Sequence, residues 1–225
     1  MLAVSVQRLS PLHDALAHLH PHWGEIGGMP VPLDYGDPDG ERRQAETLAL
    51  CDVSALARVV VKGPKAEALL QVQGVPVPKK ILRCEPLPQG GLIARTGGAE
   101  FFLEDGVEGD TVAKIETALG SGRPGVYRVL RQDASLLLSG SRATELLLET
   151  CGYDFRLAGP ELVMTRVAGV SCAILPRTLN GLTVFQLWAD GTYGFYLWET
   201  LLDIAREMGG GAVGVNCFLD LEGAK

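Results

Sequence analysis

Three histidines near the start of the chain have side chains that could bind a metal ion. His18, His20 and His22 alternate in the segment HLHPH, and alternate residues of an extended chain share one edge. A zinc site needs three or four ligands at suitable spacing, and no carboxylate or further ligand stands at a fixed distance from these histidines. We therefore expect the solvated end of a helix here, and no metal.

Four aromatic residues near the other end could form a stacking platform for a planar ligand. They are Trp188, Tyr193, Tyr196 and Trp198. Their spacing fits the strand and the last helix of a hydrophobic core equally well, because Trp and Tyr bury large apolar areas. We favour the core.

A third candidate is the stretch at residues 59–70, VVVKGPKAEALL, which reads as a strand, a glycine turn and the start of a helix. Such a turn can bind phosphate at the helix N-terminus. The Gly-Lys-Ser/Thr ending of a phosphate loop is absent, however, and Pro64 lacks an N–H group that could contact an anion. We predict a structural turn. The chain also lacks the Gly-x-Ser-x-Gly motif, so a hydrolase function has no support.

This stretch occurs twice. Residues 136–147, LLLSGSRATELL, repeat it 77 positions later, with Gly140 at the place of Gly63. A self-match of this kind indicates two copies of one supersecondary unit. We expect a single domain over residues 1–225, built from pseudo-repeats at about 51–120 and 127–208 and preceded by a helical and loop extension over residues 1–50.

Local patterns predict the elements of the extension. Ser10 and Pro11 begin a short amphipathic helix that Pro21 ends. Residues 23–39 are dense in Gly and Pro and are expected to form a loop. Asp39 is placed to cap a second helix that runs to about Ala49.

Each predicted half has the order strand, helix, strand, strand, helix. In the first half we expect Pro64 at the first helical position, a short strand near Ile81 and a helix capped by Asp110. Residues 121–125 are expected to form a linker, and the second half is expected to begin at Tyr127. The predicted strands are 59–61, 92–95 and 100–104 in the first half and 135–138, 162–166, 170–175 and 184–188 in the second, with a last helix over about 197–208. Strands outnumber helices and short turns join them. The fold class is therefore α+β, with two similar intertwined halves, mainly antiparallel sheets and packed helices.

Composition narrows the function. The net charge is −7 and the 20 Lys and Arg residues are dispersed, so the basic patch that nucleic-acid binding needs is missing. No leader of the signal-peptide type and no membrane-spanning apolar run is present, which predicts a cytoplasmic protein without membrane contact.

The five cysteines are odd in number and far apart, which favours buried, reduced thiols. The mean hydropathy of +0.16 could reflect apolar surface for a partner or simply the core.

Several ordered motifs are spread from about Pro11 to Gly223: PLHDALAHLH, MPVPLDYG, LALCDVSALARVVVKGPKAEALLQ, QGGLIART, RTLNG, FQLW, LWETLLDIA and LDLEGAK. Together they resemble the glycine cleavage T protein, an aminomethyltransferase that uses tetrahydrofolate. The resemblance implies the folate-binding-domain fold of that family, a role in one-carbon metabolism, tetrahydrofolate as ligand and no metal. The residues in the matching segments that it nominates for folate binding are Met29, Arg95, Arg177 and Glu222.

The departures from the family concern catalysis. Its active-site strand carries two aspartates, one of them the catalytic carboxylate, and the matching residues here are Ala94 and Arg95. Neither can take up a proton at neutral pH. The loop LNGLT lacks the family's Tyr and Glu, and Asn216 replaces an arginine. We therefore expect no catalytic residue, and Arg95 either binds an anion or fills the pocket. The sequence is also expected to lack the family's C-terminal barrel.

A second resemblance gives the alternative function. The segments DASLLLSGSRATELLLETCGYDFR and LWETLLDIAREMGG are similar to the γ subunit of heterotetrameric sarcosine oxidase. That resemblance implies a non-catalytic interaction subunit, with a protein partner or a second copy of the chain in place of a ligand.

Overall fold

The computed structural model describes residues 8–219, which divide into two compact units. Unit 1 contains the residues up to Ala55 together with Asp133–Leu157 and Met164–Leu219. Unit 2 contains Leu56–Gln132 and Ala158–Val163. No helix within residues 8–219 is long and apolar enough to cross a membrane.

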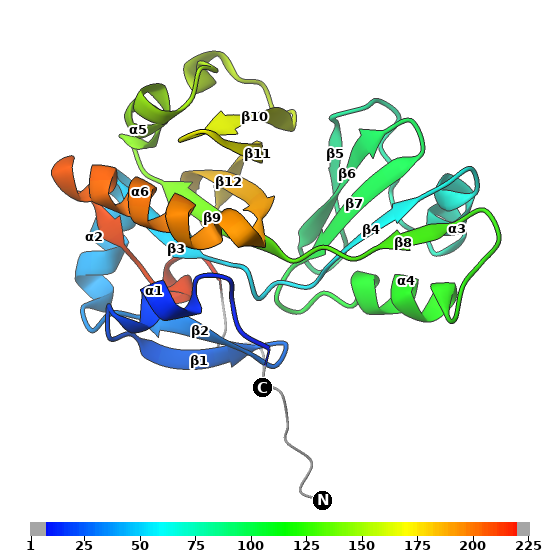
Figure 1. Cartoon of the computed structure of the whole chain (residues 1–225), viewed down its shortest axis with the longest axis horizontal. Helices are drawn as coiled ribbons and strands as arrows, with labels where there is room; N and C mark the ends of the chain where they lie inside the picture. Colours follow the sequence, from blue (N-terminus) through cyan, green and yellow to red (C-terminus); the bar gives the residue numbers. More distant parts are fainter. Residues whose placement is uncertain (1–7, 220–225) are drawn as a thin grey trace, which may run out of the picture. The chain divides into compact units, whose positions relative to one another are not determined.

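Unit 2 is a five-stranded sheet with two helices. The strand order is β5-β6-β7-β4-β8, and every neighbouring pair is antiparallel. Residues of α3 and α4, among them Leu70 and Ile115, share one buried cluster with Val61, Ile93 and Phe101 of the sheet. In chain order the elements are β4 (Arg58–Lys62), α3 (Ala66–Val72), β5 (Cys84–Pro86), β6 (Gly91–Gly97), β7 (Glu100–Asp105), α4 (Thr111–Leu119) and β8 (Tyr127–Val129), as labelled in Figure 1.

Unit 1 has a six-stranded sheet in the order β10-β11-β12-β9-β3-β13 and a separate β1-β2 hairpin. The short pair of β13 with β3 runs parallel. The β3-β9, β9-β12 and β11-β12 pairs are antiparallel. The elements are α1 (His13–Ala17), β1 (His22–Ile26), β2 (Met29–Asp34), α2 (Pro38–Thr47), β3 (Ala49–Asp52), β9 (Asp133–Ser139), α5 (Ala143–Thr150), η1 (Phe155–Leu157), β10 (Val163–Val167), β11 (Val170–Leu179), β12 (Leu182–Asp190), η2 (Gly191–Tyr193), α6 (Gly194–Glu207), β13 (Gly211–Ala212) and η3 (Val215–Cys217).

The two units share one plan. The series β4-α3-β5-β6-β7-α4 has the same order as β9-α5-β10-β11-β12-α6, and the sheets contain the matching strand orders β5-β6-β7-β4 and β10-β11-β12-β9. Gly63 and Gly140 both have positive φ, +124° and +100°. The Gly63 N–H donates to the carbonyl of Ala99 and the Gly140 N–H to that of Thr183, each near the turn of the adjacent hairpin. The α+β class with two similar halves is therefore confirmed.

The prediction of a loop over residues 23–39 was wrong. β1 and β2 form a hairpin whose two-residue turn is Gly27-Gly28, with φ of +55° and +79°. Two residues with positive φ form the turn type that best matches the twist of paired strands, and glycine adopts it without steric penalty. Ile26, Met29 and Val31 then lie buried along the hairpin. The density of Gly and Pro concealed this pattern.

Two helix caps also differ from the prediction. Asp37, not Asp39, caps α2 by accepting from the Gly40 N–H, and α2 ends at Thr47 because Ala49 already belongs to β3. Asp110 stands at the N-cap of α4 without a capping bond. The carboxylate of Asp105 accepts the Val112 N–H at 2.8 Å instead. Sequence spacing could not predict this cap, because Asp105 lies on a strand.

Four boundaries shift as well. α3 begins at Ala66 with Lys65 as its N-cap, so Pro64 precedes the helix. β5 begins at Cys84 rather than near Ile81. β8, which includes Tyr127, pairs with β4 in the sheet of unit 2, so the second half begins at β9. β3 is an inner strand of the unit 1 sheet, so the predicted extension over residues 1–50 already contains the start of that sheet.

Candidate functional site

Arg177 lies on the long β11-β12 hairpin of unit 1. The hairpin turns at Asn180-Gly181, which have φ of +49° and +80° and suit a two-residue turn. The Arg177 guanidinium donates to Oε1 of Gln186 at 2.5 Å, and Gln186 in turn donates from Nε2 to Oγ of Ser135 at 3.3 Å. Charge-assisted hydrogen bonds of this kind hold an arginine in a defined position.

The hydrogen bonds continue into the core of unit 1. Ser135 donates its N–H to Oγ of Ser54 at 2.9 Å, and the Ser54 N–H donates to Oδ1 of Asp52 at 2.9 Å. Ser10, just before α1, donates its hydroxyl to Oδ2 of Asp52 at 2.6 Å. These four side chains and Gln186 are all buried. A buried polar network is stable only when each member has a hydrogen-bond partner. The network therefore holds the Gln186 side chain in place, and Gln186 in turn positions the Arg177 guanidinium.

Met29 is the first residue of β2 and pairs with Ile26 across the Gly27-Gly28 turn. Its side chain is among the largest fully buried ones. Met29 therefore belongs to the same unit as Arg177 but contributes to its core. Glu222 lies outside the described residues.

Arg95 lies on β6 in unit 2, where its guanidinium already has several partners. One terminal nitrogen donates to Oε2 of Glu67 on α3 at 3.0 Å and to the carbonyl of Gly98 at 2.6 Å, and the other donates to the carbonyl of Pro78 at 3.1 Å. The charged group also lies 5.1 Å from the centre of the Phe101 ring. Arg95 thus connects α3, the segment before β5 and the β6-β7 turn.

Strand β7, which pairs with β6, carries two glutamates in the sheet around Ala94 and Arg95. Ala94 is fully buried. Glu104 forms a cross-strand ion pair with Arg58, with a nitrogen–oxygen distance of 3.0 Å, and both side chains are at most 2% exposed. Glu100 accepts a hydrogen bond from the Thr96 hydroxyl at 2.8 Å. Both carboxylates have structural partners.

Burial also affects three polar groups of unit 1, on Tyr35, Cys51 and Cys217. The hydroxyl of Tyr35 has no hydrogen-bond partner among the described residues. Burial raises the pKa of the Tyr35 hydroxyl and of the Cys51 thiol far above their ordinary values, and raises the pKa of the Cys217 thiol to about 11. These groups are therefore protonated at neutral pH and are poor nucleophiles.

The histidines and cysteines form no metal site in the described part of the chain, where no cluster of three or more His, Cys, Asp or Glu has suitable geometry. His22 instead contacts Oδ1 of Asp34 through Nδ1 at 2.7 Å. All five cysteines have free thiols, with Cys51, Cys151 and Cys172 buried.

The four aromatic residues near the end of the chain differ in their exposure to solvent. Trp188 and Trp198 are buried, as the core interpretation predicts. Tyr193 and Tyr196 are about half exposed, at 55% and 51%, and the Tyr196 hydroxyl donates to the carbonyl of Ala168 at 3.1 Å. On α6 the helical pattern places Trp198 on the core face and leaves Tyr196 at the surface.

The sequence contains a signal for the network around Arg177. Ser135 interrupts the apolar run ASLLL, and Gln186 interrupts the run VFQLW. A polar residue in an otherwise buried strand needs a partner, so these positions indicate an internal hydrogen-bond network.

Comparison with known proteins gives a consistent result, although no family model matches the chain. An aminomethyltransferase from Moorella thermoacetica is 28% identical over 201 residues, covering 82% of this chain and 55% of the relative. The chain therefore spans about half the length of that curated relative.

Two solved structures share the fold. The glycine cleavage system aminomethyltransferase T from Bartonella henselae superimposes with a TM-score of 0.71 at 19% identity, over 94% of this chain and 61% of that one. A chain of the heterotetrameric sarcosine oxidase from Corynebacterium sp. U-96 superimposes with a TM-score of 0.61 at 18% identity, over 79% of this chain and 95% of that one. The resemblance to the glycine cleavage T protein family is thereby confirmed: the chain is similar to an aminomethyltransferase in sequence and to these two structures in fold.

Proposed function

We propose that this chain is a tetrahydrofolate-binding domain of cytoplasmic one-carbon metabolism that does not itself catalyse aminomethyl transfer. The single observation that carries the proposal is the similarity to aminomethyltransferases in sequence and fold, combined with Ala94 and Arg95 at the positions of the family's aspartates. Folate binding needs the fold and its polar side chains, whereas the transfer needs a carboxylate that can share a proton.

The contacts of the two arginines assign them different roles in this proposal. Arg95 is tied to Glu67, Pro78 and Gly98 within its own unit, so it fills its position and adds nothing to ligand binding. Arg177 is held by Gln186 on a hairpin of the other unit. A guanidinium fixed in this way suits the carboxylate of a folate.

An assay for the transfer tests the catalytic half. Purified protein supplied with tetrahydrofolate and an aminomethyl donor is expected to form no methylene-tetrahydrofolate above the rate without protein. Robust turnover that Glu222→Ala abolishes would show that the site is active. A thermal-shift series with folinic acid tests the binding half, because a ligand that binds only the folded state raises the Tm with concentration.

A second function is supported by a different observation. The sarcosine oxidase chain that shares this fold is matched over 95% of its length and comes from a heterotetramer. Around the start of α6, Tyr193, Phe195 and Tyr196 are each at least half exposed. Under this alternative the chain is a non-catalytic interaction subunit with an oxidase-type partner.

Light scattering after gel filtration separates the two functions. An interaction subunit is expected to self-associate or to form a stoichiometric complex when co-expressed with its oxidase-type partner. A monodisperse monomer that binds folate would argue against the interaction function.

A further inference from the structure

Asn180 and Gly181 form the tip of the β11-β12 hairpin of unit 1. The chain contains only two asparagines, Asn180 and Asn216, and Asn180 alone is followed by glycine. Both residues of the tip are exposed, and their positive φ values match the two-residue turn that joins twisted strands. The tip therefore presents a side-chain amide and a glycine nitrogen next to each other at the surface.

The Gly181 nitrogen is free of the contacts that hold most backbone nitrogens. A Cβ at Gly181 would meet no atom within 4 Å, so the surroundings of this residue are open. Its N–H has no hydrogen-bond acceptor among the described residues. A backbone N–H that no carbonyl holds is solvated, so hydroxide can remove its proton. The deprotonated nitrogen is a nucleophile, and the nearest electrophile in the covalent chain is the side-chain carbon Cγ of Asn180.

The Asn180 amide has one restraint in the folded protein. Its Nδ2 donates to the carbonyl of Phe218 at 3.1 Å. The Phe218 ring is buried, and its N–H donates to the carbonyl of Val215 at 2.9 Å, so the acceptor is itself held in place. A single hydrogen bond at an exposed turn opens readily. The bond therefore slows a reaction at Asn180 but does not prevent it.

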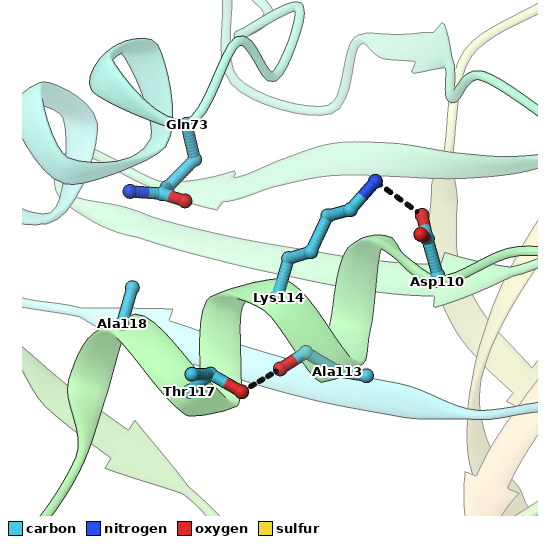
Figure 2. A pocket seen from close by; sticks show the side chains of 6 residues that line it. All are labelled: Gln73, Asp110, Ala113, Lys114, Thr117 and Ala118. Carbon is cyan, nitrogen blue, oxygen red and sulfur yellow. Dashed lines mark hydrogen bonds and ion pairs between the residues drawn. The ribbon is translucent and has the colours of Figure 1, made fainter.

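Two glutamines are also followed by glycine and provide comparisons within the same chain. Gln89 and Gly90 both have positive φ, +61° and +83°. Gln73 lines a surface cavity of unit 2, as Figure 2 shows, and the N–H of the following Gly74 already donates to the carbonyl of Gln71. Glutamine has one methylene group more than asparagine, so its side chain closes a larger and less readily formed ring. Asn180 is therefore the amide of this chain that is best placed to react.

We propose that Asn180-Gly181 is a site of covalent modification, at which the Gly181 nitrogen displaces the side-chain amide of Asn180. A bond forms between this nitrogen and Cγ of Asn180, the bond from Cγ to Nδ2 breaks, and Nδ2 leaves as ammonia with the proton that Gly181 gives up. Water then adds to either carbonyl of the five-membered imide ring, which leaves aspartate or isoaspartate at position 180. The reaction consumes only water and involves no oxidant or reductant.

The products cannot keep the contact with Phe218. A carboxylate has no proton to donate, and it places a negative charge against the Phe218 carbonyl oxygen. Isoaspartate also adds a methylene group to the backbone of the turn, and the register of a hairpin depends on the length of its turn. The modification therefore releases Phe218 from the hairpin that carries Arg177. It requires no ligand, so this proposal and the proposed folate function can fail independently.

Incubation of the purified full chain in mildly alkaline buffer, followed by peptide mapping with mass spectrometry, tests the site. We expect the mass change from amide to acid to accumulate at Asn180 at least ~10-fold faster than at Asn216, Gln73 or Gln89, because ring closure is an intramolecular reaction that depends on geometry. Asn216 is a matched control, because it is also exposed but the N–H of the following Cys217 donates to the carbonyl of Gly214. The rate at Asn180 should rise with pH, since the reaction needs the deprotonated Gly181 nitrogen.

Two variants complete the test. Asn180→Gln keeps an amide donor and the glycine, and Gly181→Ala places a methyl group beside the reacting nitrogen. Each should slow conversion at position 180 at least ~10-fold. A peptide of residues 177–183, RTLNGLT, shows that the buffer permits the reaction. The proposal is overturned if the peptide converts while Asn180 of the protein converts no faster than Asn216, or if both variants convert at the wild-type rate.

Discussion

Arg95 illustrates how one residue changes role when its neighbours change. The family resemblance nominates it for folate contact, yet its guanidinium donates to Glu67, Gly98 and Pro78 and lies over Phe101. The side chain is only 15% exposed. Of the two roles left open by the sequence, filling the position therefore fits the contacts better than binding an anion.

Arg95→Met should destabilise unit 2. The variant keeps an apolar stem over Phe101 but loses hydrogen bonds to a carboxylate and two carbonyls, which should lower the free energy of unfolding by about 1–3 kcal/mol. Urea denaturation monitored by circular dichroism measures this. Arg206→Ala, which removes only an exposed ion pair with Asp203, is the control and should change stability by less than about 0.5 kcal/mol. Equal effects of the two variants would contradict the structural role of Arg95.

Asp105 should make stability depend on pH in an unusual direction. Burial raises the pKa of its carboxyl, although the Val112 N–H opposes this effect, and one of its oxygens has no partner among the described residues. A raised folded-state pKa means that the folded protein retains the proton longer than the unfolded chain does. The stability contributed by protonated Asp105 is present below the unfolded pKa of about 3.9 and is lost as pH rises through the folded pKa.

Asp105→Asn isolates this effect. The amide keeps an acceptor for the Val112 N–H but cannot ionise, so the difference in Tm between variant and wild type should shift in favour of the variant from pH 4 to pH 7. Differential scanning calorimetry across this range measures it, with Asp203→Asn as a control at an exposed carboxylate that does not act on Asp105. A difference that stays constant with pH would show that Asp105 has no raised pKa.

At the scale of elements, the repeated glycine turn is what the sequence predicted best. Gly63 and Gly140 were recognised by their spacing alone, and both have the positive φ that glycine tolerates. The structure adds the reason for the second glycine, since a Cβ at Gly140 would lie 2.3 Å from the carbonyl carbon of Thr47. That close approach of α2 involves residues far apart in the chain, so local patterns could not predict it.

Gly140→Ala should therefore be costly. Positive φ alone disfavours alanine by about 1–2 kcal/mol, and the clash with the Thr47 backbone adds to it. Gly169→Ala is a matched control, because Gly169 has φ of +84° but open space around its Cβ position. Chemical denaturation should give a clearly larger loss of unfolding free energy for Gly140→Ala. Similar losses for the two variants would mean that the backbone relaxes around residue 140.

The last helix provides the second test at this scale. Trp198 is fully buried on α6, whereas Tyr193, just before the helix, is 55% exposed. Trp198→Ala should lower the unfolding free energy by about 3–5 kcal/mol, the usual range for deleting a buried large aromatic side chain. Tyr193→Ala should cost less than about 1 kcal/mol. If the Trp198→Ala protein melts like wild type and loses a ligand, Trp198 has a binding role instead.

At the scale of the whole molecule, the fold class and the resemblance to aminomethyltransferases followed from sequence because both depend on patterns distributed over the entire chain. Periodicity predicted the last helix and the β11-β12 strands, and the ordered motifs predicted the fold that the aminomethyltransferase structure shares. The β1-β2 hairpin and the Asp105 cap escaped prediction. The first was hidden by its Gly and Pro content, and the second depends on a contact between a strand and the start of a helix.

The candidate site was less predictable than the fold. The resemblance nominated Arg95 and Arg177 equally for folate binding. Their hydrogen-bond partners distinguish them, because Arg95 is bound to Glu67 of its own unit whereas Arg177 is held by the buried Gln186. The serine and aspartate residues behind Gln186 come from three separate segments of the chain. Such a network forms only when the sheet of unit 1 is assembled, so Ser135 and Gln186 can signal that a network exists, but no local pattern identifies their partners.

Calorimetric titration of tetrahydrofolate into the wild-type, Arg177→Met and Arg95→Met proteins tests the central proposal, a folate-binding domain without the catalytic acid, most directly. The prediction is a saturable isotherm with one site per chain for wild type and Arg95→Met, and a loss of at least ~10-fold in affinity for Arg177→Met, equivalent to about 1.4 kcal/mol or more. No heat from the wild-type protein at millimolar ligand, or a loss caused by Arg95→Met and not by Arg177→Met, would contradict it.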